Sequence, residues 1–152
     1  MNPKLHSEKQ RLDNLFAQVD SLSLAEEQLS HWARYLCVLV SGFVENAIRV
    51  MITEYTRERS HPYVSSYVAK QIRRITNLNE TKIVHLLGTF STDWRQTLEA
   101  KITDQQKDAI DSVVANRHNI VHGRSVGITL VRMKEYYKRV IEVVDLIETE
   151  CM

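Results

Sequence analysis

Hydrophobic residues recur at steps of three and four along much of this chain, which is the spacing of one face of an α-helix. The first such stretch covers residues 7–19, and the next begins near Ser23, which forms a capping-box pattern with Glu26. This second stretch extends to about residue 59, and Gly42 inside it is expected to allow close packing of a neighbouring helix. Its apolar seam consists of Leu29, Trp32, Leu36, Val40, Phe43, Ala47 and Val50.

Shorter helices are predicted in the middle of the chain. Pro62 suits the first position of a third helix, which ends near residue 75. Residues 77–89 have the pattern of a turn followed by a short helix, which Gly88 would end. Another short helix is expected to begin at residue 91 or 92, where Ser and Thr can both serve as caps.

Two longer helices are predicted in the last third of the chain. The first opens at Thr103 or Asp104 and runs through residue 121, and Gly123 suits the position just beyond its end. The second is capped by Thr129 and extends to about residue 150. Four main helices with shorter ones between them indicate an all-α fold, an antiparallel four-helix bundle with additional short helices.

The composition agrees with one helical domain. Only 4 Gly and 2 Pro occur in 152 residues, and so few breakers favour long helices joined by short loops. This length suits one domain with a real core, which we place at residues 1–152 with the core at about 23–150. The formal net charge of +1 argues against a strongly basic nucleic-acid-binding protein, so any RNA contact must come from a local cluster of charges.

Three features favour a cytoplasmic protein with no membrane segment. Cys37 and Cys151 have no metal-ligand spacing, and two thiols in a chain of this size suggest a reducing compartment. The N-terminal residues contain no apolar stretch of the signal-peptide type. No run approaches the roughly 18 apolar residues that a membrane-spanning helix requires.

The main candidate chemistry lies in residues 116–123, Asn-Arg-His-Asn-Ile-Val-His-Gly, at the end of the penultimate helix. Phosphate loops, zinc-protease motifs and nucleophile elbows are absent from the sequence. The apolar pair Ile120-Val121 is expected to anchor this helix in the core. Arg117 and His122 are five residues apart, so on a regular helix they point about 140° away from each other. One rigid helix would therefore not bring both onto one phosphate.

A second copy of the helix across a two-fold axis would solve this problem, because each motif would then face its twin. The shared pocket would contain two Arg and two His. Arginine can hold a scissile phosphate and offset the charge that develops on it. One histidine can take the proton of the 2′-hydroxyl, and a second can protonate the leaving 5′-oxygen. This arrangement predicts RNA cleavage without a metal or other cofactor, leaving 2′,3′-cyclic phosphate and 5′-hydroxyl ends.

The segment resembles the motif of the HEPN (higher eukaryotes and prokaryotes nucleotide-binding) superfamily, which is Arg, a polar residue, three to five further residues and His. Arg117, His118 and His122 occupy these positions, followed by the Gly123 often found there. The residue after Arg is more often Asn in the superfamily, but a polar replacement such as His118 stays within the pattern. The resemblance is closest to the RiboL-PSP-HEPN group and covers roughly residues 25–148, with supporting segments at residues 41–47, 81–90, 107–111 and 128–137.

The resemblance implies a HEPN-like helical bundle, a homodimer with the motifs at its interface, and endoribonuclease activity with Arg117 and His122 as catalytic residues. Such domains often occur in toxin–antitoxin and anti-phage systems, which would add a cognate antitoxin or another defence protein as a partner. Some HEPN domains have lost catalysis, so a non-catalytic module that binds RNA, nucleotide or a protein partner is the alternative. A helical adaptor with no nucleic-acid role is a third alternative.

Supporting roles are predicted for several other residues, each with an ordinary structural alternative. His118 and Asn119 could contact RNA, or His118 could be a solvated surface residue; with His122 it could also bind a metal, although no third ligand is identifiable. Glu45, in an apolar part of the long helix, could pair with Arg117 or orient His122, or could face solvent. Basic side chains that could contact RNA phosphates or be simply solvated are Lys70, Arg73, Arg74 and Arg124.

Overall fold

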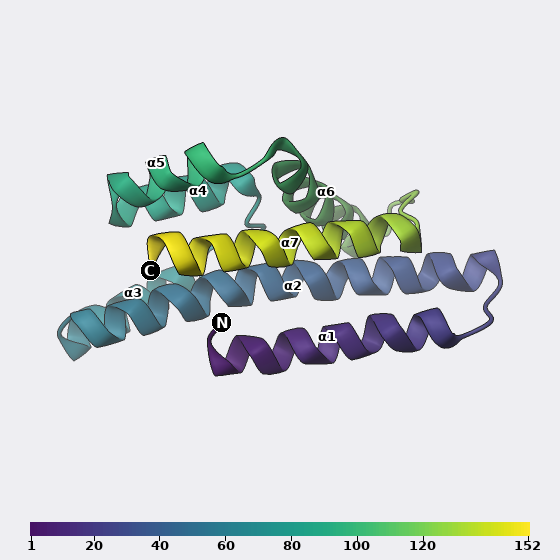
Figure 1. Cartoon of the computed structure of the whole chain (residues 1–152), viewed down its shortest axis with the longest axis horizontal. Helices are drawn as coiled ribbons and strands as arrows, with labels where there is room; N and C mark the ends of the chain where they lie inside the picture. The colour runs from purple at the N-terminus through teal and green to yellow at the C-terminus, as the bar shows by residue number, and fades with distance from the viewer.

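The long helix predicted in the first half of the chain is the central element of the fold. The computed structural model, which describes residues 1–152, places this helix, α2 (Glu26–Arg59), between α1 (Pro3–Ser21) and α7 (Leu130–Cys151) (Figure 1). Helix α6 (Asp104–Val121) packs against both α2 and α7. Successive long helices run in opposite directions (Figure 1), so the predicted antiparallel four-helix bundle is confirmed.

Three shorter helices complete the all-α fold, which contains no strand. Helix α3 (Pro62–Ile72) folds back against the C-terminal part of α2. Helices α4 (Glu80–Phe90) and α5 (Thr92–Lys101) pack on each other, and α5 also contacts α7. One continuous core of 32 buried residues includes side chains from every helix.

Helix α2 is apolar because it forms the core. By length and composition alone it could cross a membrane, since one 18-residue window has a mean hydropathy of 1.6. More than half of that window, 56%, is buried inside the structure. Helices α1, α3, α6 and α7 pack against it and supply the apolar environment that its side chains need. Its hydropathy is that of a helix that lies mostly in the core. The prediction from uninterrupted apolar runs did not identify this helix, because polar residues interrupt its apolar ones.

The predicted starts of two helices differ from the structure. Helix α2 has Ala25, not Ser23, at its N-cap, and the side chain of Gln28 accepts the backbone N–H of Ala25 at 3.1 Å. The acceptor thus lies one turn inside the helix, and the Ser23 hydroxyl plays no part. Helix α1 begins at Pro3, earlier than predicted, because the Asn2 side chain accepts the backbone N–H of Lys4.

The predictions for two glycines are wrong. Gly88 lies inside α4, which continues to Phe90, and its lack of a side chain makes room for Arg95 of α5, whose Cδ would lie 3.1 Å from an added Cβ. Gly42 is exposed, with no atom within 4 Å of an added Cβ, so it does not mark a close helix contact. Gly88 therefore has a packing role inside its helix, whereas Gly42 has none within this chain.

A polar contact inside the bundle joins α7 to α1. The ring of Tyr137 stacks on Phe16 with centroids 4.7 Å apart, and its hydroxyl donates to Asp13 at 2.8 Å. Burial raises the pKa of the Tyr137 hydroxyl well above its ordinary value, and the Asp13 carboxylate raises it further. The neutral hydroxyl is therefore the form that the folded protein favours.

Replacing this hydroxyl tests the contact between α1 and α7. We expect Tyr137→Phe to lower the free energy of unfolding by about 1 kcal/mol, because the stacked ring is kept while the hydrogen bond is lost. The contribution should be present below about pH 10 and be lost as the pH rises through the raised pKa. Urea denaturation at several pH values measures both effects. Tyr136→Phe is the matched control, and an equal loss in that variant would contradict the assignment.

Candidate functional site

The end of α6 has a defined geometry because a glycine closes it. Gly123 has a φ of 70°, in the left-handed region that favours glycine. Its backbone N–H donates to the carbonyl of Ile120 at 3.1 Å, and the backbone N–H of Arg124 donates to the carbonyl of Asn119 at 2.8 Å. These two bonds form a Schellman motif, which confirms the predicted role of Gly123. His122 is consequently fixed as the C-cap residue of α6.

Arg117 is held by a residue from a distant turn. Its Nη1 donates to Oδ1 of Asn77 at 3.0 Å, and the guanidinium group is only partly buried. Asn77 follows α3 in the chain and has a φ of 54°, a conformation that asparagine tolerates better than most residues. This backbone conformation, together with the hydrogen bond, sets the direction in which Arg117 leaves α6.

Glu45 supports this arrangement without contacting the motif. One of its carboxylate oxygens accepts the backbone N–H of Asn77 at 2.7 Å, and the other pairs with Arg49 at 3.2 Å. The predicted direct pairing with Arg117 is therefore wrong, because both oxygens already have partners. No contact with His122 is present either. Glu45 instead acts through Asn77, which it holds in place beside Arg117.

The two histidines of the motif lie together, away from the arginine. The ring centroids of His118 and His122 are 4.5 Å apart, as expected for residues one helical turn apart. Both side chains are exposed, whereas Arg117 points toward Asn77. No hydrogen bond or ring contact joins Arg117 to either histidine within one copy of the chain. Arg117 and His122 thus share no contact within one copy, and the angle of about 140° between them stays a prediction.

The inner face of α6 is anchored to α2 beside the motif. The thiol of Cys37 donates to the carbonyl of Val113 at 3.4 Å. Burial raises the pKa of this thiol to about 12, although a hydrogen bond from the backbone N–H of Arg117 lowers it in part. Cys37 is thus a packing residue that ties α2 to the turn of α6 from which Arg117 projects.

Only half of the apolar pair inside the motif anchors the helix. Ile120 packs against the core, but the side chain of Val121 is 52% exposed. The prediction that both anchor α6 is wrong for Val121, because α6 presents this position to solvent. An exposed apolar side chain next to two exposed histidines is a feature of the surface around the motif.

A polar groove of about 460 Å³ lies beside the motif. His118 and Asn119 line it from α6, Asn77 and Asn79 line it from the turn before α4, and Lys82 contributes the only Lys or Arg side chain. The side chain of Asn119 also accepts a hydrogen bond from Arg124 at 3.3 Å. The structure therefore brings His118, Asn119 and Arg124 close to one another. These exposed donors can contact the phosphates or base edges of a polynucleotide.

Lys70, Arg73 and Arg74, three of the basic residues predicted as possible RNA contacts, do not line one common cavity in the structure. Helix α3 ends at Ile72, earlier than predicted, and the next two residues form a tighter turn in which Arg74 donates its backbone N–H to Gln71. Arg73 lines a cavity against α2, whereas Lys70 and Arg74 are exposed and do not line it. Neither Lys70 nor Arg74 has an ion-pair partner.

Metal-ligand geometry is absent around the histidine pair. No group of three or more His, Cys, Asp or Glu side chains in the chain is arranged to hold a metal ion. His118 and His122 would therefore supply two ligands without a third from the same copy.

An all-α bundle whose penultimate long helix ends in Arg117-His118-x3-His122 defines a HEPN-type domain. The family model of RiboL-PSP-HEPN matches residues 4–152, and the chain belongs to this family. The match includes α1, which lies outside the segment covered by the resemblance noted from the sequence. The comparison with curated proteins and the comparison with solved structures gave no match.

Sequence reasoning missed Asn77 as a residue of this site. An asparagine in a short connection between helices indicates a turn, and a left-handed conformation is common for such a residue. Nothing local shows that its side chain meets Arg117, because the two residues are 40 positions apart. The contact requires the complete packing of α2, α6 and the turn.

Two substitutions of Asn77 separate its backbone role from its side-chain role. Asn77→Gly keeps the left-handed backbone and removes the acceptor for Arg117, whereas Asn77→Ala also forces a side chain into that conformation. We expect Asn77→Ala to be less stable than Asn77→Gly by about 1 kcal/mol, because alanine is strained at positive φ. Thermal or urea unfolding of both variants measures the difference. Equal stability of the two would show that the positive φ does not constrain this turn.

Proposed function

We propose that this protein is a metal-independent endoribonuclease that uses Arg117 and His122 from two copies of the chain. The observation that carries the proposal is the divergence of these groups within one copy, where Arg117 turns toward Asn77 and His122 lies with His118. A second copy that faces the end of α6 would bring an arginine of one subunit to the histidines of the other.

The proposed reaction transfers two protons and breaks one bond. A His122 imidazole accepts the proton of the ribose 2′-hydroxyl, and the resulting oxygen attacks the adjacent phosphorus. The bond from phosphorus to the 5′-oxygen then breaks, and a protonated histidine donates a proton to that oxygen. Arg117 stabilises the negative charge on the phosphoryl oxygens as it develops. The products are a 2′,3′-cyclic phosphate and a 5′-hydroxyl, and water is not consumed in this step.

The surface around the motif supports association of two copies. Val121, at the end of α6, is 52% exposed, and Val131, at the start of α7, is 77% exposed. Exposed aliphatic side chains beside functional groups favour burial against a partner surface. A two-fold contact here would cover both valines and bring the two histidine pairs toward the same axis.

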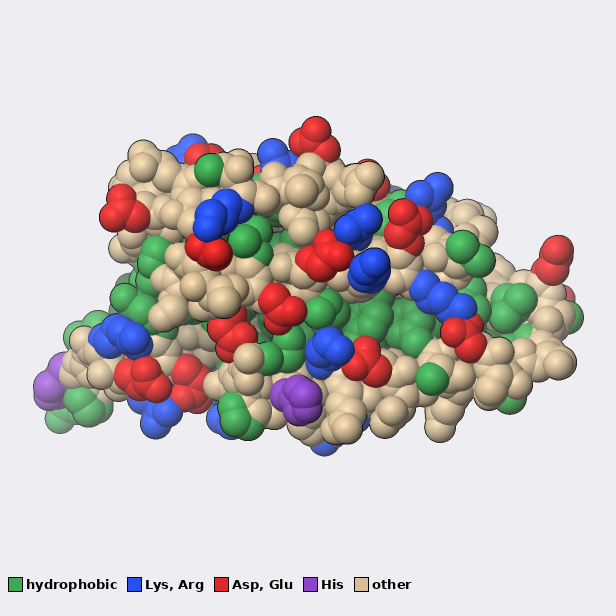
Figure 2. All heavy atoms as spheres, viewed as in Figure 1, with side chains coloured by type: hydrophobic (Ala, Val, Ile, Leu, Met, Phe, Trp, Pro, Cys, Tyr) green, Lys and Arg blue, Asp and Glu red, His purple; other side chains and the backbone are tan.

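The proposed RNA contacts lie where the chain has a local excess of basic residues. On the face drawn in Figure 2, basic and acidic side chains are interspersed, in keeping with a net charge of +1. The chain between Glu58 and Glu80 is different, because it contains four Lys or Arg and no Asp or Glu. Such a segment can attract phosphates although the protein as a whole is nearly neutral.

Exposed tyrosines lie on this segment together with the basic residues. Tyr63 and Tyr67 are 82% and 64% exposed, and with Lys70 they are spaced along one face of α3. Aromatic rings with nearby cations suit single-stranded RNA, whose bases stack on the rings while its phosphates meet the cations. Arg74 lies three residues before Asn77, the partner of Arg117. A single-stranded RNA that follows α3 would therefore lead toward the motif.

The alternative is a non-catalytic HEPN module that uses the same surfaces to bind RNA, nucleotide or a protein partner. We favour the enzyme because both motif residues are present and because Arg117 is oriented by a hydrogen bond while both histidines stay accessible. A role in a toxin–antitoxin or anti-phage system, in the cytoplasm and with a cognate antitoxin, is part of the proposal.

Cleavage of RNA in EDTA tests the reaction. Wild-type protein should cleave total RNA and tRNA and leave 2′,3′-cyclic phosphate ends, while Arg117→Ala and His122→Ala should each lose at least about a hundredfold in rate. Gel analysis and end mapping of the products provide the measurement. His85→Ala is the control for loss of an exposed imidazole outside the motif, and it should cleave as wild type does. Absence of cleavage by a folded, dimeric wild type would favour the binding module.

Mixing subunits tests whether the site is shared. If both copies must supply His122, an equal mixture of wild type and His122→Ala, after subunit exchange, should retain about one quarter of the activity, the share of wild-type homodimers. A site built within one copy would retain about one half at the same total concentration. Initial cleavage rates across a series of mixing ratios separate a quadratic dependence from a linear one. A linear dependence would rule out a site that needs His122 from both copies.

A further inference from the structure

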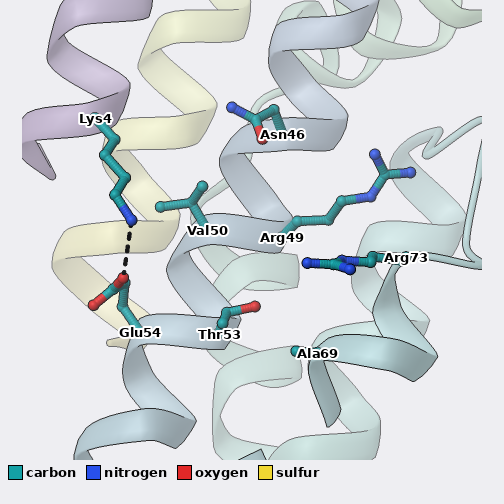
Figure 3. Close-up of a pocket in the computed structure, with 8 residues that line it drawn as sticks. All are labelled: Lys4, Asn46, Arg49, Val50, Thr53, Glu54, Ala69 and Arg73. Atoms are coloured by element: carbon teal, nitrogen blue, oxygen red, sulfur yellow. Dashed lines mark ion pairs between the residues drawn. The ribbon is translucent and has the colours of Figure 1, made fainter. Parts of the chain in front are cut away.

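A second cationic site lies between α1, α2 and α3, at a cavity of about 320 Å³ (Figure 3). Arg49 of α2 and Arg73, just beyond α3, both line it, and their side chains approach it from opposite directions. Lys4, Asn46 and Thr53 add an ammonium group, an amide and a hydroxyl to its lining. Neither the motif residues nor the groove beside His118 belongs to this cavity.

The two guanidinium groups have unused donors. The Nη2 of Arg49 donates to Glu45 and to the carbonyl of Ile75 at 2.9 Å, but its Nε is buried without any hydrogen-bond partner. Arg73 forms no ion pair and its side chain donates no hydrogen bond, although both groups lie in the same cavity. The Nε of Arg49 has no accessible surface, but its Nη1 is not buried and has no partner, so this group and the N–H groups of Arg73 are the donors that an acceptor entering the cavity can meet.

Acidic groups near the cavity are already occupied. Glu54, the only acidic residue in the lining, pairs with Lys4 at 3.7 Å and also with Arg57. The hydrogen bond from Arg57 is the main cause that lowers the pKa of Glu54, so the carboxylate is held in its charged form. Glu45 pairs with Arg49 but does not line the cavity, and the Glu8 carboxylate accepts from the Asn46 amide. None of these acids pairs with Arg73.

We propose that this cavity binds the phosphate of a phosphate monoester between Arg49 and Arg73. Both side chains are positively charged and line one cavity, so an anion inside it can gain an attractive contact with each of them. Guanidinium groups present paired N–H donors that match phosphate oxygens, and the Thr53 hydroxyl and Lys4 ammonium can contact the remaining oxygens. The volume falls at the lower end of the range of about 300–1,000 Å³ typical of small-molecule sites, so part of the group that carries the phosphate also fits.

The proposal does not depend on the nuclease activity, because the cavity contains neither Arg117 nor His122. The phosphate could belong to a small molecule such as a nucleotide or to the end of an RNA strand. Both sources share the same monoester chemistry, and the choice of probes distinguishes them. RNA probes with 2′-O-methyl groups cannot be cleaved by attack of a 2′-hydroxyl, so binding is measured without turnover.

Calorimetric titration at constant ionic strength tests the site. The probes are inorganic phosphate, adenosine 5′-monophosphate with adenosine as its uncharged counterpart, and a short 2′-O-methyl oligonucleotide with or without a 5′-phosphate. The variants are Arg73→Gln and Arg11→Gln, which remove the same charge from exposed positions that form no ion pair, and only the first of these lines the cavity. Circular dichroism confirms that each variant is folded.

We expect wild type to prefer the phosphorylated member of at least one pair, and Arg73→Gln to weaken that binding by about tenfold or more. Arg11→Gln should stay within about twofold of wild type, since non-specific screening affects both variants alike. Binding of the mononucleotide as tight as that of the oligonucleotide would identify a small ligand, and tighter binding of the 5′-phosphorylated strand would identify an RNA end. Equal binding with and without phosphate, or equal losses in the two variants, would overturn the proposal.

Discussion

Burial of the apolar side chains of α2 is the constraint on which the other elements depend. A helix of 34 residues at about 1.5 Å per residue is roughly 50 Å long, and its buried positions run from Ala33 to Thr56. Helices α1, α3, α6 and α7 each cover part of that length, and none of them could bury its own apolar stripe without it. The positions of the motif and of the cationic cavity are therefore both defined relative to one rigid element.

The environment of Arg117 shows how this constraint reaches the candidate active site. Glu45 projects from α2 and holds the backbone of Asn77, whose side chain accepts the hydrogen bond of Arg117. Each link is a polar contact at the edge of the core, where partial burial strengthens a hydrogen bond and leaves the group accessible. The orientation of the arginine is thus set by the bundle, whereas the histidines follow directly from the end of α6.

The fold was largely predictable from the sequence because helical periodicity is local. The long helices and the bundle followed from the spacing of apolar residues, the three short helices followed from a proline, a turn pattern and caps, and Gly123 marked the end of α6 as predicted. Errors arose where one residue type serves several purposes. Ser23 could have been a cap and was not, and the packing roles of Gly42 and Gly88 depend on neighbours that periodicity does not identify.

The candidate site was predictable only in part, because local patterns do not show which distant residues meet. Arg117 and His122 are close in sequence, so their divergence on one helix could be derived from helical geometry. The contacts of Glu45 with Asn77 and of Asn77 with Arg117 connect positions 32 and 40 residues apart. The cavity between Arg49 and Arg73 likewise exists only once α3 has folded back on α2. No local pattern encodes such contacts.

The chain of contacts from Glu45 through Asn77 to Arg117 also has an evolutionary consequence. A change at position 45 releases the backbone of Asn77, and a change at position 77 releases Arg117, so neither position can drift independently. Selection on the arginine therefore extends to two residues that never touch the substrate in the proposed reaction. Across relatives of this chain, these three positions should vary as one unit, in step with whether the arginine itself is kept.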